Sequence, residues 1–177
     1  RSGDGGSTWL FRASAVTENL NKVAASSGLF VVAGNAGKIL TSADGATWES
    51  RSSGFGTSAV LGAEYLGSLF LAFGENGKLA TSSDGTAWTD RTSAFGSTSI
   101  RAAAKTGSKW VLAGDSGKIT NSTDAATWAE RATPFAGSSI RKLAYASGTL
   151  MALGASGVLA KSTDNGDTWA AVSGVST

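Results

Sequence analysis

A pattern of four apolar and polar stretches recurs along the chain about every 40 residues. In one copy, alternating residues over Ile100–Lys105 precede an apolar run over Lys109–Ala113, then a stretch at Lys118–Ser122 and a short segment at Trp128–Arg131. Alternation predicts a strand with one buried face, and a short apolar run predicts a strand covered on both faces. Turn residues fill the links, and no window shows a helical apolar stripe. Each repeat is therefore expected to contain four strands.

Glycines and tryptophans at fixed positions mark the repeats. A glycine follows each apolar run at intervals of 40 residues, at Gly34, Gly74, Gly114 and Gly154. A tryptophan follows each later turn, at Trp9, Trp48, Trp88, Trp128 and Trp169. Four-stranded repeats of this length are typical of β-propeller blades, each of which buries its two apolar faces against its neighbours. We therefore expect an all-β β-propeller.

The repeats divide the single domain, residues 1–177, into four complete blades and one partial N-terminal blade. The complete blades are expected at residues 19–58, 59–98, 99–138 and 139–177, and the partial blade at 1–18. The partial blade carries only a fourth strand, at Trp9–Arg12, so this strand has no sheet partner of its own. We favour a chain that is part of a longer repeat protein. A strand that completes a neighbouring subunit's blade, or one added to a four-bladed ring, are alternatives.

A turn with a central aspartate, here called an Asp turn, precedes each repeated tryptophan. The five aspartates are Asp4, Asp44, Asp84, Asp124 and Asp164. A short carboxylate can accept hydrogen bonds from the backbone of its own turn, and the tryptophan can wedge between neighbouring sheets. The alternative is that these aspartates bind a metal or act as acids. We favour the structural role, because repetition spreads them around the rim of the molecule.

The Asp turns carry a family resemblance. Their pattern Ser-x-Asp-x-Gly-x-Thr-Trp resembles the Asp box of bacterial neuraminidase type (BNR) repeats, with departures at Ala87 and Ala125. The repeats are also similar to those of phage virion and bacterial surface proteins. The resemblance implies a non-enzymatic fibre, decoration or adhesin component, outside the cell or on a virion, with glycan binding as a candidate activity. Other Asp-box propellers imply two alternatives, a sialidase-like glycoside hydrolase and a protein-assembly scaffold.

The catalytic residues that the sialidase resemblance implies are incomplete. Sialidases use three arginines and a Tyr–Glu pair, whereas this chain has two tyrosines, Tyr65 and Tyr145, at one repeat position. Glu64 is adjacent to Tyr65 and should point to the opposite face of the strand. Arg101 and Arg141 share another repeat position. The other copies of that position are Asn21 and Leu61. We expect no enzymatic activity and no catalytic residue.

Basic and aromatic residues recur after the Asp turns. The arginines are Arg12, Arg51, Arg91 and Arg131, and the phenylalanines are Phe55, Phe95 and Phe135. One interpretation is that phenylalanine fills the space between blades while arginine caps polar groups at the rim. The other is a repeated shallow groove that binds glycans or an acidic partner. The weak binding candidates are therefore these residues, except Arg12, together with Arg101 and Arg141.

The amino-acid composition excludes several classes of catalytic and metal site. The 177 residues include no histidine and no cysteine, which excludes Cys/His zinc sites, thiol catalysis and histidine-dependent triads. A net charge of +2 gives no sign of nucleic-acid binding, and no apolar run is long enough for a membrane span. We expect no cofactor and no metal. The expected partners are protein subunits of an assembly, surface glycans, or a second copy bound through the N-terminal strand.

Overall fold

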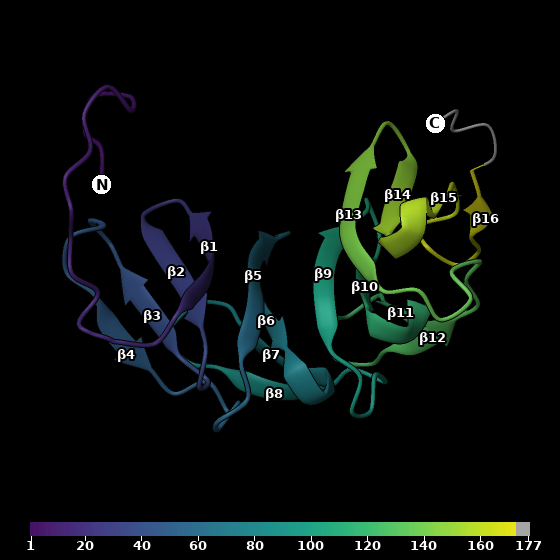
Figure 1. The fold of residues 1–177 in the computed structure, drawn as a ribbon, viewed down its shortest axis with the longest axis horizontal. Coiled ribbons are helices and arrows are strands. Elements are labelled where there is room, and N and C mark those ends of the chain that lie inside the picture. The colour runs from purple at the N-terminus through teal and green to yellow at the C-terminus, as the bar shows by residue number, and fades with distance from the viewer. Residues whose placement is uncertain (173–177) are drawn as a thin grey trace.

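The computed structural model describes residues 1–172, which form four sheets of four consecutive strands each (Figure 1). The first two sheets comprise β1 (Leu20–Ser26), β2 (Leu29–Gly34), β3 (Ile39–Ser42) and β4 (Glu49–Arg51), then β5 (Val60–Leu66), β6 (Leu69–Gly74), β7 (Lys78–Ser82) and β8 (Thr89–Thr92). The other two comprise β9 (Ile100–Lys105), β10 (Trp110–Gly114), β11 (Ile119–Ser122) and β12 (Ala129–Arg131), then β13 (Ile140–Ala146), β14 (Thr149–Gly154), β15 (Leu159–Ser162) and β16 (Ala170–Ala171). All strand pairs are antiparallel. The expected all-β architecture of four-stranded propeller blades is confirmed.

The sheets follow one another along an open arc (Figure 1). The first strands, β1, β5, β9 and β13, lie on the inner side of the arc, where each contacts the next. The fourth strands lie on the outer side. Residues at the same repeat position therefore lie at the same place on each sheet, relative to the inner surface of the arc.

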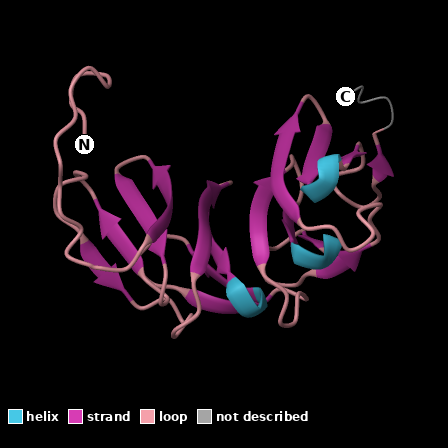
Figure 2. Ribbon diagram, viewed as in Figure 1, coloured by secondary structure: helices cyan, strands magenta, loops and turns pink. Residues whose placement is uncertain are grey.

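Helical structure in residues 1–172 is confined to three short 3₁₀ turns between second and third strands (Figure 2). They are η1 (Glu75–Gly77), η2 (Asp115–Gly117) and η3 (Ala155–Gly157). The described part of the chain has no helix that is long and apolar enough to cross a membrane.

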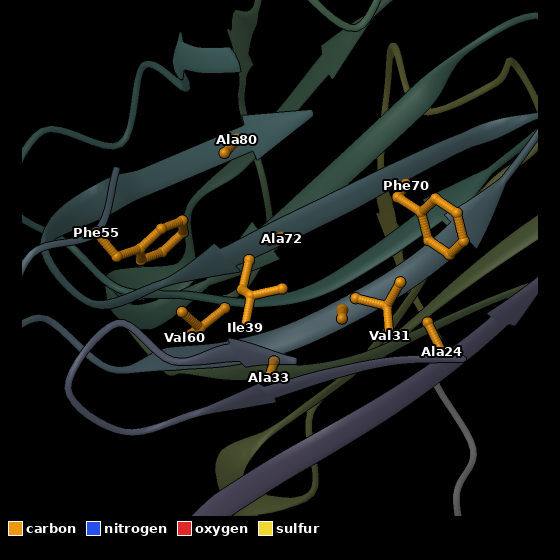
Figure 3. Close-up of a cluster of buried hydrophobic side chains, with 10 residues drawn as sticks. Ala24, Val31, Ala33, Ile39, Phe55, Val60, Phe70, Ala72 and Ala80 are labelled. Carbon is orange, nitrogen blue, oxygen red and sulfur yellow. The ribbon is translucent and has the colours of Figure 1, made fainter. Parts of the chain in front are cut away.

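Neighbouring sheets pack through a repeated apolar interface. Between the first two sheets, Val31 and Ile39 face Val60 and Phe70, while Phe55 from the connecting segment fills the gap (Figure 3). The equivalent cluster of the second junction contains Leu71, Phe95, Ile100 and Trp128, and that of the third contains Val111, Phe135, Ile140 and Trp169. Burial of both faces of each inner sheet explains why the second strands are apolar throughout.

The N-terminal segment departs from the predicted partial blade. Its Asp turn forms, since the Thr8 amide donates to Asp4 Oδ1 at 3.0 Å and the Gly6 amide donates to Ser2 Oγ at 2.8 Å. The expected strand at Trp9–Arg12 does not form, and the first strand of the described residues begins at Leu20. The segment has only one bonded pair: the Leu10 amide donates to the Arg1 carbonyl at 2.8 Å, and the Arg1 amino group donates to the Leu10 carbonyl at 2.9 Å. A single bonded pair is too short for a strand, which needs a continuous ladder to a neighbour.

Candidate functional site

Four equivalent residues converge on the inner surface of the arc. Each is the second residue of the first strand of its sheet: Asn21, Leu61, Arg101 and Arg141. Together they line a pocket of about 330 Å³, which we call the axial pocket. The sequence placed Arg101 and Arg141 at one repeat position, and the structure brings them to one pocket.

Arg101 is held in place by a carboxylate at the edge of the axial pocket. Its Nη2 donates to Asp115 Oδ2 at 2.7 Å, and its Nε donates to Asp115 Oδ1. This hydrogen bonding raises the pKa of Arg101 and holds the pKa of the Asp115 carboxyl below its usual range. Both side chains are therefore charged near neutral pH, and the guanidinium has a fixed orientation.

Arg141 is the cation of the axial pocket that has no bonding partner among the described residues. Its side chain is exposed and makes no hydrogen bond or ion pair within residues 1–172. The side-chain amide of Asn21 is already hydrogen-bonded, because its Nδ2 donates to Asn35 Oδ1 at 2.9 Å and to the Val60 carbonyl at 3.0 Å. A ligand entering the axial pocket would therefore meet Arg141 as the free donor group.

An adjoining cavity of about 210 Å³ extends the positive charge along the inner surface. Its lining includes Lys22, Glu64 and Lys142 in addition to the two arginines of the axial pocket. Lys22 Nζ lies 3.0 Å from Glu64 Oε1, an ion pair that joins the first two sheets. Four cationic side chains and one carboxylate line this cavity, which favours an anionic ligand.

The arginines of the fourth strands do not converge. Arg51 Nε donates to Thr41 Oγ1 at 2.9 Å and Arg91 Nε to Thr81 Oγ1 at 3.0 Å, each across to the third strand of its own sheet. Arg131 Nε makes the equivalent bond to Asn121 Oδ1. Each arginine lies on a different sheet at the outer side of the arc, so these residues can form only separate shallow sites.

The phenylalanines predicted as groove candidates are almost completely buried. Phe55, Phe95 and Phe135 are only 0–1% exposed and belong to the three clusters between sheets. This burial favours the interpretation in which the phenylalanines fill the space between blades, although Phe55 borders a surface pocket of about 300 Å³ together with Arg91. The phenylalanines are buried because the segment connecting two sheets turns inward, and its large apolar side chain packs between them.

The Asp turns have the hydrogen bonds that a structural role requires. Asp44 Oδ1 accepts the Ala46 and Thr47 amides at 2.7 and 2.9 Å, and Ser42 Oγ accepts the Gly45 amide at 2.8 Å. Equivalent bonds to the aspartate recur at Asp84, Asp124 and Asp164. Residues 1–172 contain no cluster of three acidic side chains that could hold a metal ion.

Acid is expected to destabilise the protein through the Asp turns. The backbone amide of Thr47 is the main cause that lowers the pKa of Asp44 to about 2. Because this folded-state pKa lies below the unfolded value of about 3.9, the stabilisation is present above pH 4 and is lost as pH falls toward 2. Melting temperatures measured between pH 5 and pH 2 should fall, and Asp44→Asn should have a lower Tm at pH 5 but a flatter pH profile. Parallel profiles for the two proteins would contradict this role.

Sequence reasoning missed three charged residues of the inner surface. Lys22 and Lys142 follow Asn21 and Arg141 at one repeat position, which was the available signal. Asp115 lies in the turn after a second strand, and no local pattern indicates that this turn reaches the neighbouring first strand. Its pairing with Arg101 depends on the register that places Gly114 opposite Ile100.

Comparison with known proteins gives a family. Residues 66–177 match the model of the DUF6242 beta propeller domain. No curated protein matches the sequence.

Solved structures give the same architecture at low sequence identity. A virginiamycin B lyase from Staphylococcus aureus is 10% identical with a TM-score of 0.78; the match covers 91% of this chain and 57% of the lyase. YCF48 bound to D1 peptide is 16% identical with a TM-score of 0.69, covering 94% of this chain and 57% of YCF48. The computationally designed Ika4 protein is 12% identical with a TM-score of 0.68, covering 83% and 92%. The chain thus spans little more than half the length of these two natural propellers.

Proposed function

The chain belongs to the DUF6242 beta propeller domain family, and from this premise we propose that it is a non-catalytic binding propeller whose axial pocket takes carboxylated glycans. Its Asp turns are, in this proposal, Asp boxes of the bacterial neuraminidase type that fix the outer hairpins of the blades. The setting that we propose is a virion or cell surface, as a fibre, decoration or adhesin component. The low charge and the repeated serine, threonine and glycine are consistent with an exposed structural part.

The observation that carries this proposal is the convergence of Arg101 and Arg141 in one pocket. A guanidinium presents paired N–H donors that match the two oxygens of a carboxylate. Arg101 is oriented by Asp115, and Arg141 retains its donors for a ligand. The remaining cations of the adjoining cavity add a favourable potential for acidic sugars such as sialic or uronic acids.

The carboxylates near the axial pocket support binding without catalysis. Glycoside hydrolysis uses two carboxyl groups that act on the same bond, about 5–9.5 Å apart. Asp115 is paired with Arg101 and Glu64 with Lys22, so both are engaged as structural partners. Tyr65, the neighbour of Glu64, packs against Phe70 with 4.6 Å between ring centroids. Turnover of a fluorogenic sialoside that is abolished by Tyr65→Phe or Tyr145→Phe would contradict the non-catalytic proposal.

Replacing Arg141 by alanine is expected to weaken binding of a sialylated or uronate-containing oligosaccharide by about 10- to 100-fold. The estimate corresponds to a loss of about 1.5–3 kcal/mol for one charge-assisted hydrogen-bonded contact. Candidate glycans are first selected on an array, and affinities are then measured by calorimetry. Arg91→Ala is the matched control, because it removes the same group from the outer side and should leave affinity unchanged. An equal loss in both variants, or no glycan bound by the folded protein, would contradict the proposal.

A second candidate function is protein assembly. It is favoured by the likeness to YCF48, a propeller solved with a bound peptide. A peptide with a free or side-chain carboxylate would meet the same Arg141 donors in the axial pocket. Arrays of acidic peptides are probed beside the glycan arrays, with the same two variants. The function is assigned by the class of ligand whose binding is lost in Arg141→Ala and retained in Arg91→Ala.

A further inference from the structure

The interface between neighbouring sheets has two different halves. The earlier sheet contributes residues of its second and third strands, which we call its forward face; Val31 and Ile39 are examples. The later sheet contributes residues of its first and second strands, which we call its backward face; Val60 and Phe70 are examples. Equivalent residues form both halves at the second and third junctions. A forward face thus packs against a backward face at every junction of the arc.

The two end sheets each leave one of these halves partly uncovered, although Val32 and Leu40 of the first sheet remain buried. On the backward face of the first sheet, Leu20, Val23 and Phe30 are 43%, 55% and 40% exposed. The equivalent residues of the second sheet, Val60, Ala63 and Phe70, are at most 2% exposed. On the forward face of the fourth sheet, Leu153 is 46% exposed, whereas its equivalents Ala33, Phe73 and Ala113 are at most 1% exposed. The molecule therefore presents one unpartnered face of each kind.

Residues next to the first sheet enlarge its uncovered surface. Trp9, Leu10 and Phe11 of the N-terminal segment are 74%, 61% and 91% exposed. Trp9 lines a cavity of about 620 Å³ together with Phe30 and Trp48 of the first sheet. Exposed apolar residues gathered at one place are typical of a protein–protein contact.

We propose that the two end faces bind a second copy of this chain, head to tail, so that two chains close one eight-sheet ring. The contact continues the three internal junctions, since the forward face of one fourth sheet packs against the backward face of its partner's first sheet. Two such contacts close the ring by a two-fold axis. The N-terminal residues Trp9, Leu10 and Phe11 of each copy are covered in this contact.

Sedimentation velocity at micromolar concentration tests the proposal on the 177-residue chain. The expected result is a single species of twice the 17.7 kDa chain mass. Val23→Glu and Leu153→Glu place a charge on the backward and the forward end face, and each should give a folded monomer by circular dichroism. Thr89→Glu is the matched control: it adds the same charge at an exposed position of β8 and should remain dimeric.

Mixing the two monomeric variants separates a head-to-tail contact from a symmetric one. Val23→Glu retains an intact forward face and Leu153→Glu an intact backward face, so an equimolar mixture should form a heterodimer through one contact. A contact between two like faces would be lost in only one of the variants and would not be restored by mixing. A wild-type chain that stays monomeric, a species larger than two copies, or a mixture that stays monomeric overturns the proposal. The end faces would then be covered by another segment or another protein.

Discussion

Replacing Phe95 by alanine is expected to lower the free energy of unfolding by about 3–5 kcal/mol. The side chain is fully buried between the second and third sheets, against Leu71, Leu112 and their neighbours. Its removal takes apolar surface from the junction and leaves a cavity that two rigid sheets cannot close. Urea denaturation followed by tryptophan fluorescence measures the change.

Phe11→Ala is the matched control for Phe95→Ala. The substitution is the same, but Phe11 is 91% exposed in the single chain, so its loss should change stability by less than about 0.5 kcal/mol under monomeric conditions. Should Phe95→Ala fail to fold, Phe95→Leu provides a milder variant with a smaller loss. Similar stabilities for Phe95→Ala and the wild type would show that the junction does not depend on this side chain.

Replacing Gly77 by alanine is expected to destabilise the protein by about 3 kcal/mol or more, combining backbone strain with overpacking. Gly77 has φ +62°, and an added Cβ would lie 2.2 Å from the Gly96 carbonyl oxygen. The close approach arises because the turn after β6 nests against the segment that leads to β9, where Ser93 Oγ donates to the Gly77 carbonyl at 2.6 Å. Thermal and urea unfolding measure the loss.

Gly96→Ala separates the two causes. Gly96 has the same φ of +62°, but an added Cβ would meet no atom within 4 Å. Its cost should therefore be limited to the backbone strain of about 1–2 kcal/mol. Equal losses at Gly77 and Gly96 would contradict the close packing of the turn against the connecting segment.

Local patterns in the sequence were sufficient for the strands of the four complete blades, but not for the segment Trp9–Arg12. The expected strand at Ile100–Lys105 coincides with β9, and the apolar run at Lys109–Ala113 corresponds to β10, which is shifted by one residue. Fourfold repetition made these patterns recognisable, because random variation differs between copies while the structural positions recur. The bonds of the Asp turns were also predictable, since donor and acceptor lie within five residues of each other.

The candidate site depended on information that a single repeat does not contain. Arg101 and Arg141 were recognisable as one repeat position, but only the arrangement of the sheets places that position on the inner surface. The same limit applies to Phe95, for which the sequence left two interpretations open. An aromatic residue after a strand is compatible with either a surface groove or a buried junction, and the path of the connecting segment decides between them.

Mapping of the bound ligand by ¹⁵N–¹H correlation spectra tests the proposed binding function most directly. A sialylated oligosaccharide is titrated into the labelled chain, with its neutral asialo counterpart as the control. The largest amide shifts are expected at Asn21, Leu61, Arg101 and Arg141, and the neutral sugar should produce none there. Shifts centred on the outer Arg51, Arg91 and Arg131, or no shifts with either sugar, would contradict the proposed binding function.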